Sequence, residues 1–322
     1  MKFRTEVHIE PFAKPLEYSS EILSIGSCFA DEIAARLRRA KFRVTTSPVG
    51  ILFNPASIAD ALNHFAECRT VSAEEIFARD ESWFSFDAHS ALDRPTKEQA
   101  IEAFNDAIQR GYEAMMRADT LIITFGTAWV YTLNATGKVV ANCHKVAQSQ
   151  FSRRRLSVEE ITAMYRPLIE GALRGKQIIL TVSPVRHLGD GAEQNAVSKA
   201  TLRLAADALC EQFDNVRYFP AYELLNDDLR DYRFYADDLV HPSKAAVEYI
   251  WEKFSTAALS AQTREQMARV MRIVAAAEHR PQNPHSTEYA NFCRRNIEAI
   301  GQLPMVDFSE ETAFFEQYIN KS

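Results

Sequence analysis

The sequence predicts an α/β protein: a three-layer α/β/α sandwich around a mostly parallel five-stranded sheet, with a helical C-terminal extension. Two observations predict it. Short apolar runs, typical of buried strands, alternate with turns and with segments of helical periodicity. This alternation stops after Phe254, where only helical patterns remain. The expected strands are Ile22–Ile25, Arg43–Thr46, Leu121–Phe125, Gln177–Val182 and Val216–Phe219.

Amphipathic spacing predicts the helices between these strands. Asn54 is a good N-cap, and Pro55 follows at the first helical position, where its missing N–H costs nothing. The segment 67–96 has no clear period and is expected to be an irregular insertion with short helices. The other expected helices are Asp31–Ala40, Ala100–Arg117, Val158–Arg174 and Asn195–Phe213.

We expect two domains, an α/β domain over 1–256 and a helical extension over 257–322. Helical patterns cover Thr263–Glu278 and Glu288–Ile300, and the prolines of RPQNPHS predict a loop between them. We expect an apolar stripe on the first of these helices to pack within the chain, with an assembly interface as the alternative. The stripe consists of Met267, Val270, Met271 and Val274.

Composition limits the classes of function. The 322 residues are 47% hydrophobic and 25% charged, which is ordinary for a soluble globular protein. A net charge of -6 gives no basic field that would attract a nucleic acid. No apolar run reaches the ~20 residues that span a bilayer, and the first residues lack the pattern of a secretory signal. We therefore expect a cytoplasmic protein without nucleic-acid or membrane partners.

The residue types that bind metals and cofactors lack the spacings of such sites. The five cysteines are scattered without a CxxC pair, so neither a disulfide framework nor a zinc knuckle is expected. Asp238 and the histidines do not have HExxH spacing, and no GxGxxG or Walker loop occurs. The sequence thus predicts reduced thiols, no metal and no nucleotide cofactor.

The segment Gly26-Ser27-Cys28 lies between the first expected strand and its helix. A turn at the carboxyl end of a strand is where open α/β sheets build their sites. Glycine allows the tight turn, and the free N–H groups at a helix start can stabilise a developing oxyanion. The alternative is a plain turn, with Ser27 as helix cap and Cys28 as a small buried side chain.

A second motif places Asp238 three residues before His241, where a strong helix begins. At that spacing the carboxylate can accept from the imidazole Nδ1–H, which leaves Nε2 as a base. The alternative is a surface histidine beside an aspartate that only caps the helix. A serine on an early turn and an Asp-x-x-His motif late in the chain together favour a Ser-His-Asp hydrolase.

Several motifs resemble those of the GSCFA-domain family, which is similar to the SGNH (GDSL-type) esterase clan. These motifs are GSCFA at 26–30, ANCHK at 141–145, SPVRH at 183–187 and DLRDYRFYADDLVHPS at 228–243. The resemblance covers roughly residues 20 to 255. It implies an SGNH/flavodoxin-like fold, with Ser27 as nucleophile, His241 as base and Asp238 as the residue that orients His241.

The resemblance also implies an oxyanion hole. A backbone N–H of the second block maps to Gly50, and the nucleophile Ser27 is expected to add its own N–H. The third block of the clan carries an asparagine, which is missing after the strand Leu121–Phe125. Asn54 is expected to be occupied as a helix cap. The expected replacements are therefore Gly126, Thr127 or Asn142.

Positive groups gather in the motifs around this site. They are expected to bind an anionic or carbohydrate substrate, with arginine binding a carboxylate or phosphate through two hydrogen bonds. Alternatively, Arg186 and Arg230 pair with the nearby Asp190, Asp231 and Asp237 and only order the loops. The positive residues are His144, Lys145, Arg186, His187, Arg230 and Arg233.

The function expected from these patterns is that of a serine esterase. It would remove an O-acyl group, acetyl first among them, from a small-molecule or carbohydrate ester through an acyl-enzyme on Ser27. Transfer of the acyl group to an acceptor alcohol uses the same intermediate. A thiolate of Cys28 paired with His241 is a chemical alternative, and a non-catalytic module that binds a sugar or anionic metabolite is another.

Overall fold

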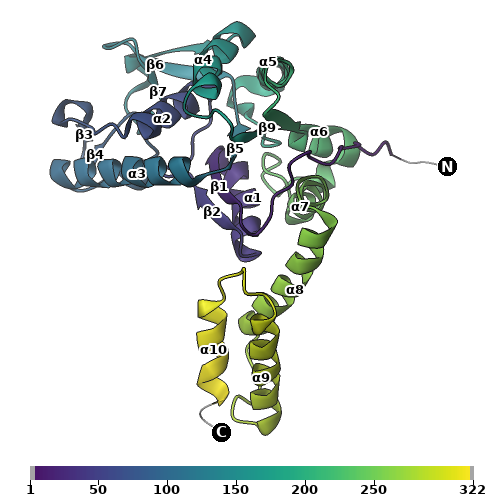
Figure 1. Cartoon of the computed structure of the whole chain (residues 1–322). Coiled ribbons are helices and arrows are strands. Elements are labelled where there is room, and N and C mark those ends of the chain that lie inside the picture. The colour runs from purple at the N-terminus through teal and green to yellow at the C-terminus, as the bar shows by residue number, and fades with distance from the viewer. Residues whose placement is uncertain (1–3, 320–322) are drawn as a thin grey trace. The chain divides into compact units, whose positions relative to one another are not determined.

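The structure, a computed structural model, describes residues 4–319 and contains a five-stranded parallel sheet with the strand order β10-β9-β5-β1-β2 (Figure 1). The predicted fold class is therefore confirmed. Three expected strands have the predicted bounds and two are longer by one or two residues. The strands are β1 Glu21–Gly26, β2 Arg43–Thr46, β5 Thr120–Phe125, β9 Gln177–Val182 and β10 Val216–Phe219.

Helices cover the sheet as in a three-layer sandwich (Figure 1). The first begins at Cys28, three residues earlier than expected, because the turn is shorter than the sequence suggested. The fourth ends at Glu170, where Gly171 is the C-cap. The helices are α1 Cys28–Arg39, α2 Pro55–Glu67, α3 Lys97–Arg117, α4 Val158–Glu170, α5 Gly191–Gln212, α6 Ala221–Glu223 and α7 Lys244–Ala258.

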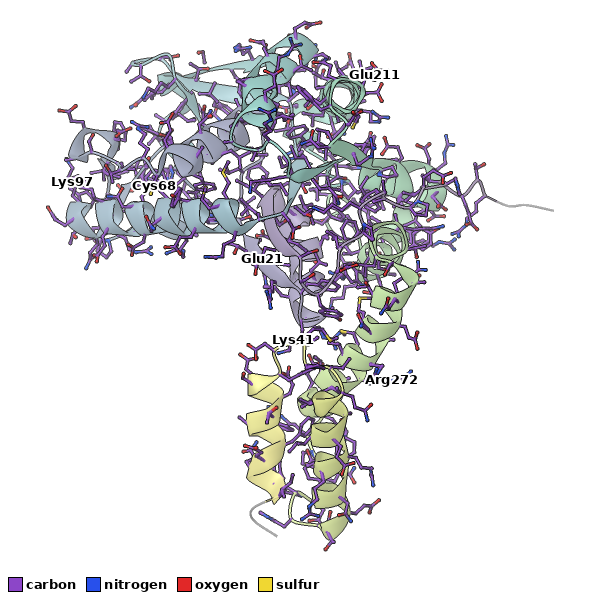
Figure 2. The ribbon with its side chains drawn as sticks, in the orientation of Figure 1. Glu21, Lys41, Cys68, Lys97, Glu211 and Arg272 are labelled. Carbon is purple, nitrogen blue, oxygen red and sulfur yellow. The ribbon has the colours of Figure 1, made fainter. Side chains whose placement is uncertain are left out.

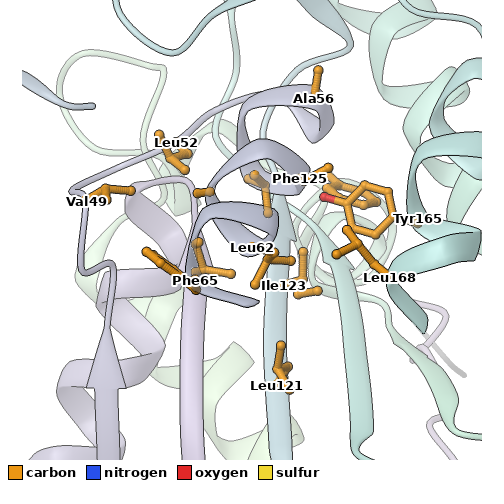
Figure 3. Close-up of a cluster of buried hydrophobic side chains, with 14 of the residues drawn as sticks. Val49, Leu52, Ala56, Leu62, Phe65, Leu121, Ile123, Phe125, Tyr165 and Leu168 are labelled. Carbon is orange, nitrogen blue, oxygen red and sulfur yellow. The ribbon is translucent and has the colours of Figure 1, made fainter. Parts of the chain in front are cut away.

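The core of the sheet is apolar on both faces, as in parallel sheets with helices on each side. All six residues of β5 are buried. Leu121, Ile123 and Phe125 belong to a cluster that includes Phe65 of α2 and Tyr165 of α4 (Figure 3). Full burial of one such side chain contributes roughly 1.5–3 kcal/mol, so this cluster holds the carboxyl end of β5 firmly in place.

The segment 67–96 contains a β-hairpin that the sequence analysis did not predict. Strands β3 Phe77–Arg79 and β4 Ser82–Phe84 pair antiparallel between two short 3-10 turns, Ala73–Glu75 and Ser90–Leu92. The ammonium of Lys97 lies 5.7 Å from the centroid of the Trp83 ring, which brings the hairpin against the start of α3 (Figure 2). Strands of three residues are too short to display a period.

A second small sheet, also not predicted, has the antiparallel order β7-β6-β8. Its strands are β6 Trp129–Leu133, β7 Val139–Val140 and β8 Phe151–Arg155. Trp129 is opposite Arg155, and Tyr131 is opposite Arg153. Since alternate residues of a strand share a face, these four side chains lie on the same face of the sheet.

The described chain forms two compact units. The first contains the residues up to Ile9, Glu21–Ala34 and Val44–Glu252. The second contains Glu10–Ser20, Ala35–Arg43 and the described residues from Lys253 onward.

In the second unit, helices α9 and α10 lie side by side (Figure 1). Its helices are α8 Ala261–Glu278, α9 Thr287–Gly301 and α10 Ser309–Ile319. The first two were expected, and α10 was not. Within 4–319, the chain after Phe254 contains no named strand, as predicted, and no helix is long and apolar enough to cross a membrane.

Candidate functional site

The strand order places a crevice at the carboxyl ends of β1 and β5. From β1 the sheet continues to β2 on one side, and from β5 it continues to β9 and β10 on the other. Open α/β sheets bind ligands where the order reverses in this way. The residues that follow these two strands are Ser27 and Gly126, so the fold brings the two sequence motifs to the same edge.

Two glycines allow these turns to approach each other closely. Gly26 has φ +142°, and a Cβ there would lie 2.2 Å from the Thr124 carbonyl oxygen, so only glycine fits. A Cβ on Gly126 would lie 2.8 Å from the Phe53 carbonyl oxygen, 3.3 Å from the Ser27 Cβ and 3.4 Å from the His187 Nε2. The side chains of Ser27 and His187 therefore lie close together beside the bare Cα of Gly126.

Ser27 is 1% exposed, and its Oγ has no hydrogen-bond partner among the described residues. It is the residue immediately before α1. A capping serine would accept a hydrogen bond from one of the first backbone N–H groups of the helix, and this Oγ accepts none. A buried polar atom without a partner needs an explanation, and a bound ligand or a catalytic role is one.

Cys28 lines the adjacent cleft, but its thiol is a poor nucleophile. Burial raises the pKa of the Cys28 thiol, and hydrogen bonds from the backbone N–H groups of Phe29 and Cys28 offset this only in part. Since the thiolate is the reactive form, a raised pKa disfavours the alternative in which Cys28 attacks the substrate.

The expected contact between Asp238 and His241 is present. The imidazole Nδ1 of His241 lies 2.7 Å from Asp238 Oδ2, and Asp238 Oδ1 accepts the backbone N–H groups of Val240 and His241 at 2.9 and 3.0 Å. One carboxylate oxygen thus caps the loop while the other orients the ring. Hydrogen bonds from the His241 backbone and side chain and from the Val240 backbone lower the pKa of Asp238 to about 2. The carboxylate therefore remains charged at neutral pH.

A cleft of about 600 Å³ lies at this edge of the sheet. Its lining comes from the turns after β1, β5 and β9, from the β7-β6-β8 sheet and from the loop before α7. His187, His241 and Cys28 are among the residues that line it. The sequence-predicted residues that line the cleft are Cys28, Thr127, Asn142, Arg186, His187 and His241.

The other predicted binding residues lie outside the lining of this cleft. His144 is buried, stacks on Phe84 with the ring centroids 4.2 Å apart, and bonds through Nε2 with the Ala88 carbonyl oxygen. Its role is structural. Lys145, Arg230 and Arg233 are exposed residues that do not line the cleft. Of the six expected positive residues, only Arg186 and His187 line the cleft.

The expected oxyanion donors are occupied. The N–H of Ser27 donates to the Thr124 carbonyl oxygen at 3.1 Å, and the N–H groups of Gly126 and Thr127 both donate to Phe53 O, at 2.8 and 2.9 Å. Gly50 does not line the cleft, and its N–H donates to Ser47 O at 2.8 Å. Each of these four groups already has a backbone acceptor in this structure, and their role as oxyanion donors stays a prediction.

The two asparagines differ in how their amides are used. Asn54 accepts the Ser57 N–H at 2.8 Å and donates to Ser57 Oγ at 3.0 Å, so the predicted cap is confirmed. Asn142 lines the cleft, and its Oδ1 accepts the His144 N–H at 2.8 Å. Its role as an oxyanion donor stays a prediction.

Arg186 does not form the ion pair with Asp190 that the alternative interpretation required. Asp190 forms an ion pair with Arg153. The guanidinium of Arg186 instead lies 3.9 Å from the centroid of the Tyr235 ring, and the Arg186 N–H donates to Val240 O at 3.1 Å. Arg186 therefore joins the turn after β9 to the loop that carries His241.

An aromatic wall is the part of the site that the sequence analysis missed. Trp129, Tyr131 and Arg153 line the cleft, with the Arg153 guanidinium 4.3 Å from the Trp129 ring centroid. The indole Nε1 of Trp129 is buried without a partner among the described residues. The run of aromatic and β-branched residues in WVYTL is the signal that could have revealed this strand.

His187 is held neutral by its surroundings. Burial, followed by the charges of Lys199 and His241, lowers the pKa of His187 to about 4 despite the opposing effect of Asp190. Lys199 is fully buried, and burial lowers its pKa to about 7. Its ammonium donates to the carbonyl oxygens of Gly126 at 2.6 Å and Ser183 at 2.7 Å, so it ties the turns after β5 and β9 together.

Sequence comparison identifies the family. Among residues 4–319, no group of three or more His, Cys, Asp or Glu side chains is arranged to hold a metal ion. No curated protein and no solved structure was found to match the chain. Residues 270–321 match the C-terminal domain of GSCFA domain proteins, and residues 21–254 match the GSCFA family. Because this second match spans most of the chain, the protein belongs to the GSCFA family.

Proposed function

We propose that this protein is a serine esterase that removes an O-acyl group, acetyl first among them, from a small-molecule or carbohydrate ester. The observation that carries the proposal is the contact of 2.7 Å between His241 Nδ1 and Asp238 Oδ2, beside a cleft that is lined by His241 and by Cys28, the residue after Ser27. That contact leaves His241 Nε2 as the available base. The buried, unpartnered hydroxyl of Ser27 is the nucleophile of the proposal.

In the first half of the proposed reaction, His241 Nε2 takes the proton of Ser27 Oγ as the oxygen attacks the acyl carbonyl. The carbonyl electron pair moves onto its oxygen. When this tetrahedral intermediate collapses, the bond to the alcohol breaks and His241 returns the proton to the departing oxygen. The products are an acyl-enzyme on Ser27 and a free alcohol.

In the second half, His241 takes a proton from water as the water attacks the acyl-enzyme. Collapse of this intermediate breaks the bond to Ser27 Oγ, which regains the proton from His241, and a carboxylic acid leaves. An acceptor alcohol in place of water makes the same protein an O-acyltransferase. Asp238 stabilises the imidazolium in both halves because it remains charged at neutral pH.

The strand order and the two motifs support kinship with the SGNH esterase clan. Across the sheet the strands are arranged β2-β1-β5-β9-β10. If these five strands are numbered along the chain, this is the flavodoxin-like order 2-1-3-4-5. The wall formed by Trp129 and Tyr131 supports a carbohydrate ester as substrate, because a sugar ring presents apolar C–H faces that pack on aromatic rings. The cytoplasmic location, the absence of nucleic-acid and membrane partners and the domain boundary at 256 stay predictions.

The test is turnover of p-nitrophenyl acetate by the wild type and by the Ser27→Ala variant. We expect turnover that the variant loses, together with labelling of Ser27 by a fluorophosphonate. Ser24→Ala is the matched control, because Ser24 is a buried serine of the preceding strand β1, and its hydroxyl lies 3.5 Å from the Ala30 carbonyl oxygen. Equal turnover by Ser27→Ala and the wild type would refute the proposal.

The burial of the Ser27 hydroxyl specifically favours a second candidate, a non-catalytic module that binds a sugar or anionic metabolite. This candidate predicts no ester turnover and no labelling, together with equally tight binding of an acetylated sugar by the wild type and by Ser27→Ala. Labelling of Cys28 by iodoacetamide with loss of turnover, while Ser27 stays unlabelled, would instead assign the nucleophile to Cys28.

A further inference from the structure

Attack by Ser27 would place negative charge on the former carbonyl oxygen, and this oxygen needs hydrogen-bond donors. The N–H groups of Ser27, Gly126 and Thr127 donate to backbone carbonyls, as described above. The N–H groups of Cys28 and Phe29 face the Cys28 sulfur closely enough to lower the pKa of its thiol. The backbone around the nucleophile therefore offers few free donors.

His187 brings a ring nitrogen close to the side chain of Ser27. Its Nε2 is buried and has no hydrogen-bond partner among the described residues. The Nε2 and the Ser27 Cβ lie 3.4 and 3.3 Å from the same point, the position that a Cβ on Gly126 would take. Because Gly126 has no Cβ, no side chain stands between the nucleophile and the imidazole at this point.

We propose that His187 is a catalytic residue whose Nε2–H donates a hydrogen bond to the oxyanion formed when Ser27 attacks the substrate. The inference rests on the proposed function and adds a residue to it. It gives the two histidines of the cleft different roles, with His241 as the base and His187 as a neutral donor.

The surroundings of the two rings support this division. The ring of His241 contacts Asp238, whose charge stabilises an imidazolium. The charged and titratable groups that act on His187 are Lys199, Asp190 and His241, and with burial they lower its pKa to about 4. At neutral pH His187 is therefore uncharged and a weak base. Enzymes separate acid and base roles by driving the pKa values of paired groups apart in this way.

The position of His187 is well held, as a preorganised donor requires. Its backbone N–H donates to Asn195 Oδ1 at 2.9 Å, and its ring packs edge-on against Phe53 with the centroids 5.9 Å apart. Lys199 fixes the turns on either side through its bonds to Gly126 O and Ser183 O. Lys199 is thus a positioning residue for the same hole.

The experiment compares ester turnover by the wild type with that of His187→Ala and His187→Gln. Loss of one oxyanion donor typically lowers kcat ~10²–10³-fold. We expect a loss of that size in His187→Ala with KM changed less than threefold, and a smaller loss in His187→Gln, whose amide can still donate. His89→Ala is the matched histidine control, since His89 lies outside the cleft lining, and its kcat is expected to equal that of the wild type.

The pH profile separates a donor from a base. If His187 is a donor, the acid limb of kcat/KM persists in His187→Ala, because the base of the reaction, His241, is still in place. Loss of that limb in His187→Ala would overturn the inference, because it would make His187 the base. A 10²-fold loss of kcat in Asn142→Ala beside unchanged turnover by His187→Ala would also overturn it, because Asn142 would then be the donor.

Binding of phenylboronic acid gives a readout that needs no turnover, because its tetrahedral adduct on Ser27 mimics the intermediate. We expect the Nε2–H resonance of His187 to appear downfield in the proton NMR spectrum of the adduct, and affinity to fall about 10²-fold in His187→Ala. Unchanged affinity and turnover in folded His187→Ala would overturn the inference and leave the esterase proposal standing. No adduct, no labelling and no turnover in the wild type would refute the esterase proposal first, and the inference with it.

Discussion

At the scale of the residue, the cleft contains charged groups in two very different surroundings. Asp238 and His241 are each about half exposed, and hydrogen bonds stabilise the charged carboxylate of Asp238. Lys199 is buried and His187 is partly buried, with its Nε2 inaccessible, so their neutral forms are favoured. The same edge of the sheet can therefore hold a base that accepts a proton and a donor that stays uncharged.

Replacement of Asp238 by asparagine is expected to lower kcat by about 10²–10⁴. The amide cannot stabilise an imidazolium, and its NH2 group favours the wrong tautomer of His241. The measurement is ester turnover between pH 6 and 9. Asp237→Asn is the control, because Asp237 is the neighbour of Asp238 in the sequence and the ring of His241 contacts Asp238 instead. A similar loss in both variants would attribute the effect to the loop instead.

Lys199 predicts a pH dependence of stability. Its pKa is about 7 in the folded protein and 10.5 in a free side chain. Between these values the unfolded chain binds more protons, so the free energy of unfolding contributed by this group rises with pH, by at most about 1.4 kcal/mol per unit. In Lys199→Met this contribution is absent. The measurement is urea unfolding of both proteins from pH 7 to 10.

The effect of Lys199 is the difference between the wild type and Lys199→Met in the slope of unfolding free energy against pH. A single slope is not enough, because cysteines also titrate in this range. Neutral lysine keeps two N–H groups, so both bonds to Gly126 O and Ser183 O survive deprotonation. Parallel slopes for the wild type and Lys199→Met would contradict the prediction.

Individual site residues differed in how readily the sequence revealed them. Asp238 and His241 are three residues apart, so their contact depends on local geometry that a pattern can express. The assignment of Gly50 as an oxyanion donor depended on a position that the resemblance implied. In the structure the Gly50 N–H donates to Ser47 O. Lys199 follows the apolar period of its helix, but only the folded structure shows which carbonyls accept its hydrogen bonds.

At the scale of the element, long buried strands were predictable and short paired strands were not. The apolar run of β9 gave its bounds correctly, because a strand buried on both faces is apolar throughout. The strands β3 and β7 have only three and two residues, which is too few to show a period. They are recognised as strands only by their pairing with neighbouring strands. The helix α10 was missed because its window combines acidic and aromatic residues without a clear apolar stripe.

The cap of α2 predicts a measurable effect at the same scale. Asn54→Ala removes the acceptor for the Ser57 N–H and is expected to lower the free energy of unfolding by about 0.5–2 kcal/mol. Asn54→Asp keeps an acceptor oxygen and should retain most of the stability. Chemical denaturation measures both. Equal destabilisation by the two substitutions would show that the cap oxygen is not what stabilises α2.

At the scale of the whole molecule, the division into units differs from a division along the sequence. The second unit combines Glu10–Ser20 and Ala35–Arg43 with the C-terminal helices. Within it, Tyr18 stacks on Phe42 with the centroids 4.5 Å apart, and the backbone of Leu16 donates to Ala258 O at 2.7 Å. Periodicity could suggest where the sheet ends, but it could not assign these early segments to the late helices.

The ion pair of Lys41 and Glu311 tests this assembly. The Lys41 ammonium lies 2.6 Å from a Glu311 carboxylate whose side chain is 8% exposed. Lys41→Met leaves that carboxylate buried without its partner and is expected to cost about 3–5 kcal/mol of stability. The double variant Lys41→Met/Glu311→Leu should recover most of the loss. Urea unfolding measures both, and equal stability of Lys41→Met and the wild type would contradict the pairing.

Because one unit draws on segments from the beginning and the end of the chain, it cannot be completed while the protein is still being made. Residues 10–20 and 35–43 leave the ribosome early, and their apolar side chains stay uncovered until the last helices emerge. Molecules halted before translation ends would therefore expose Phe12, Leu16 and Tyr18 to chaperones and proteases, which gives the cell a way to recognise unfinished copies.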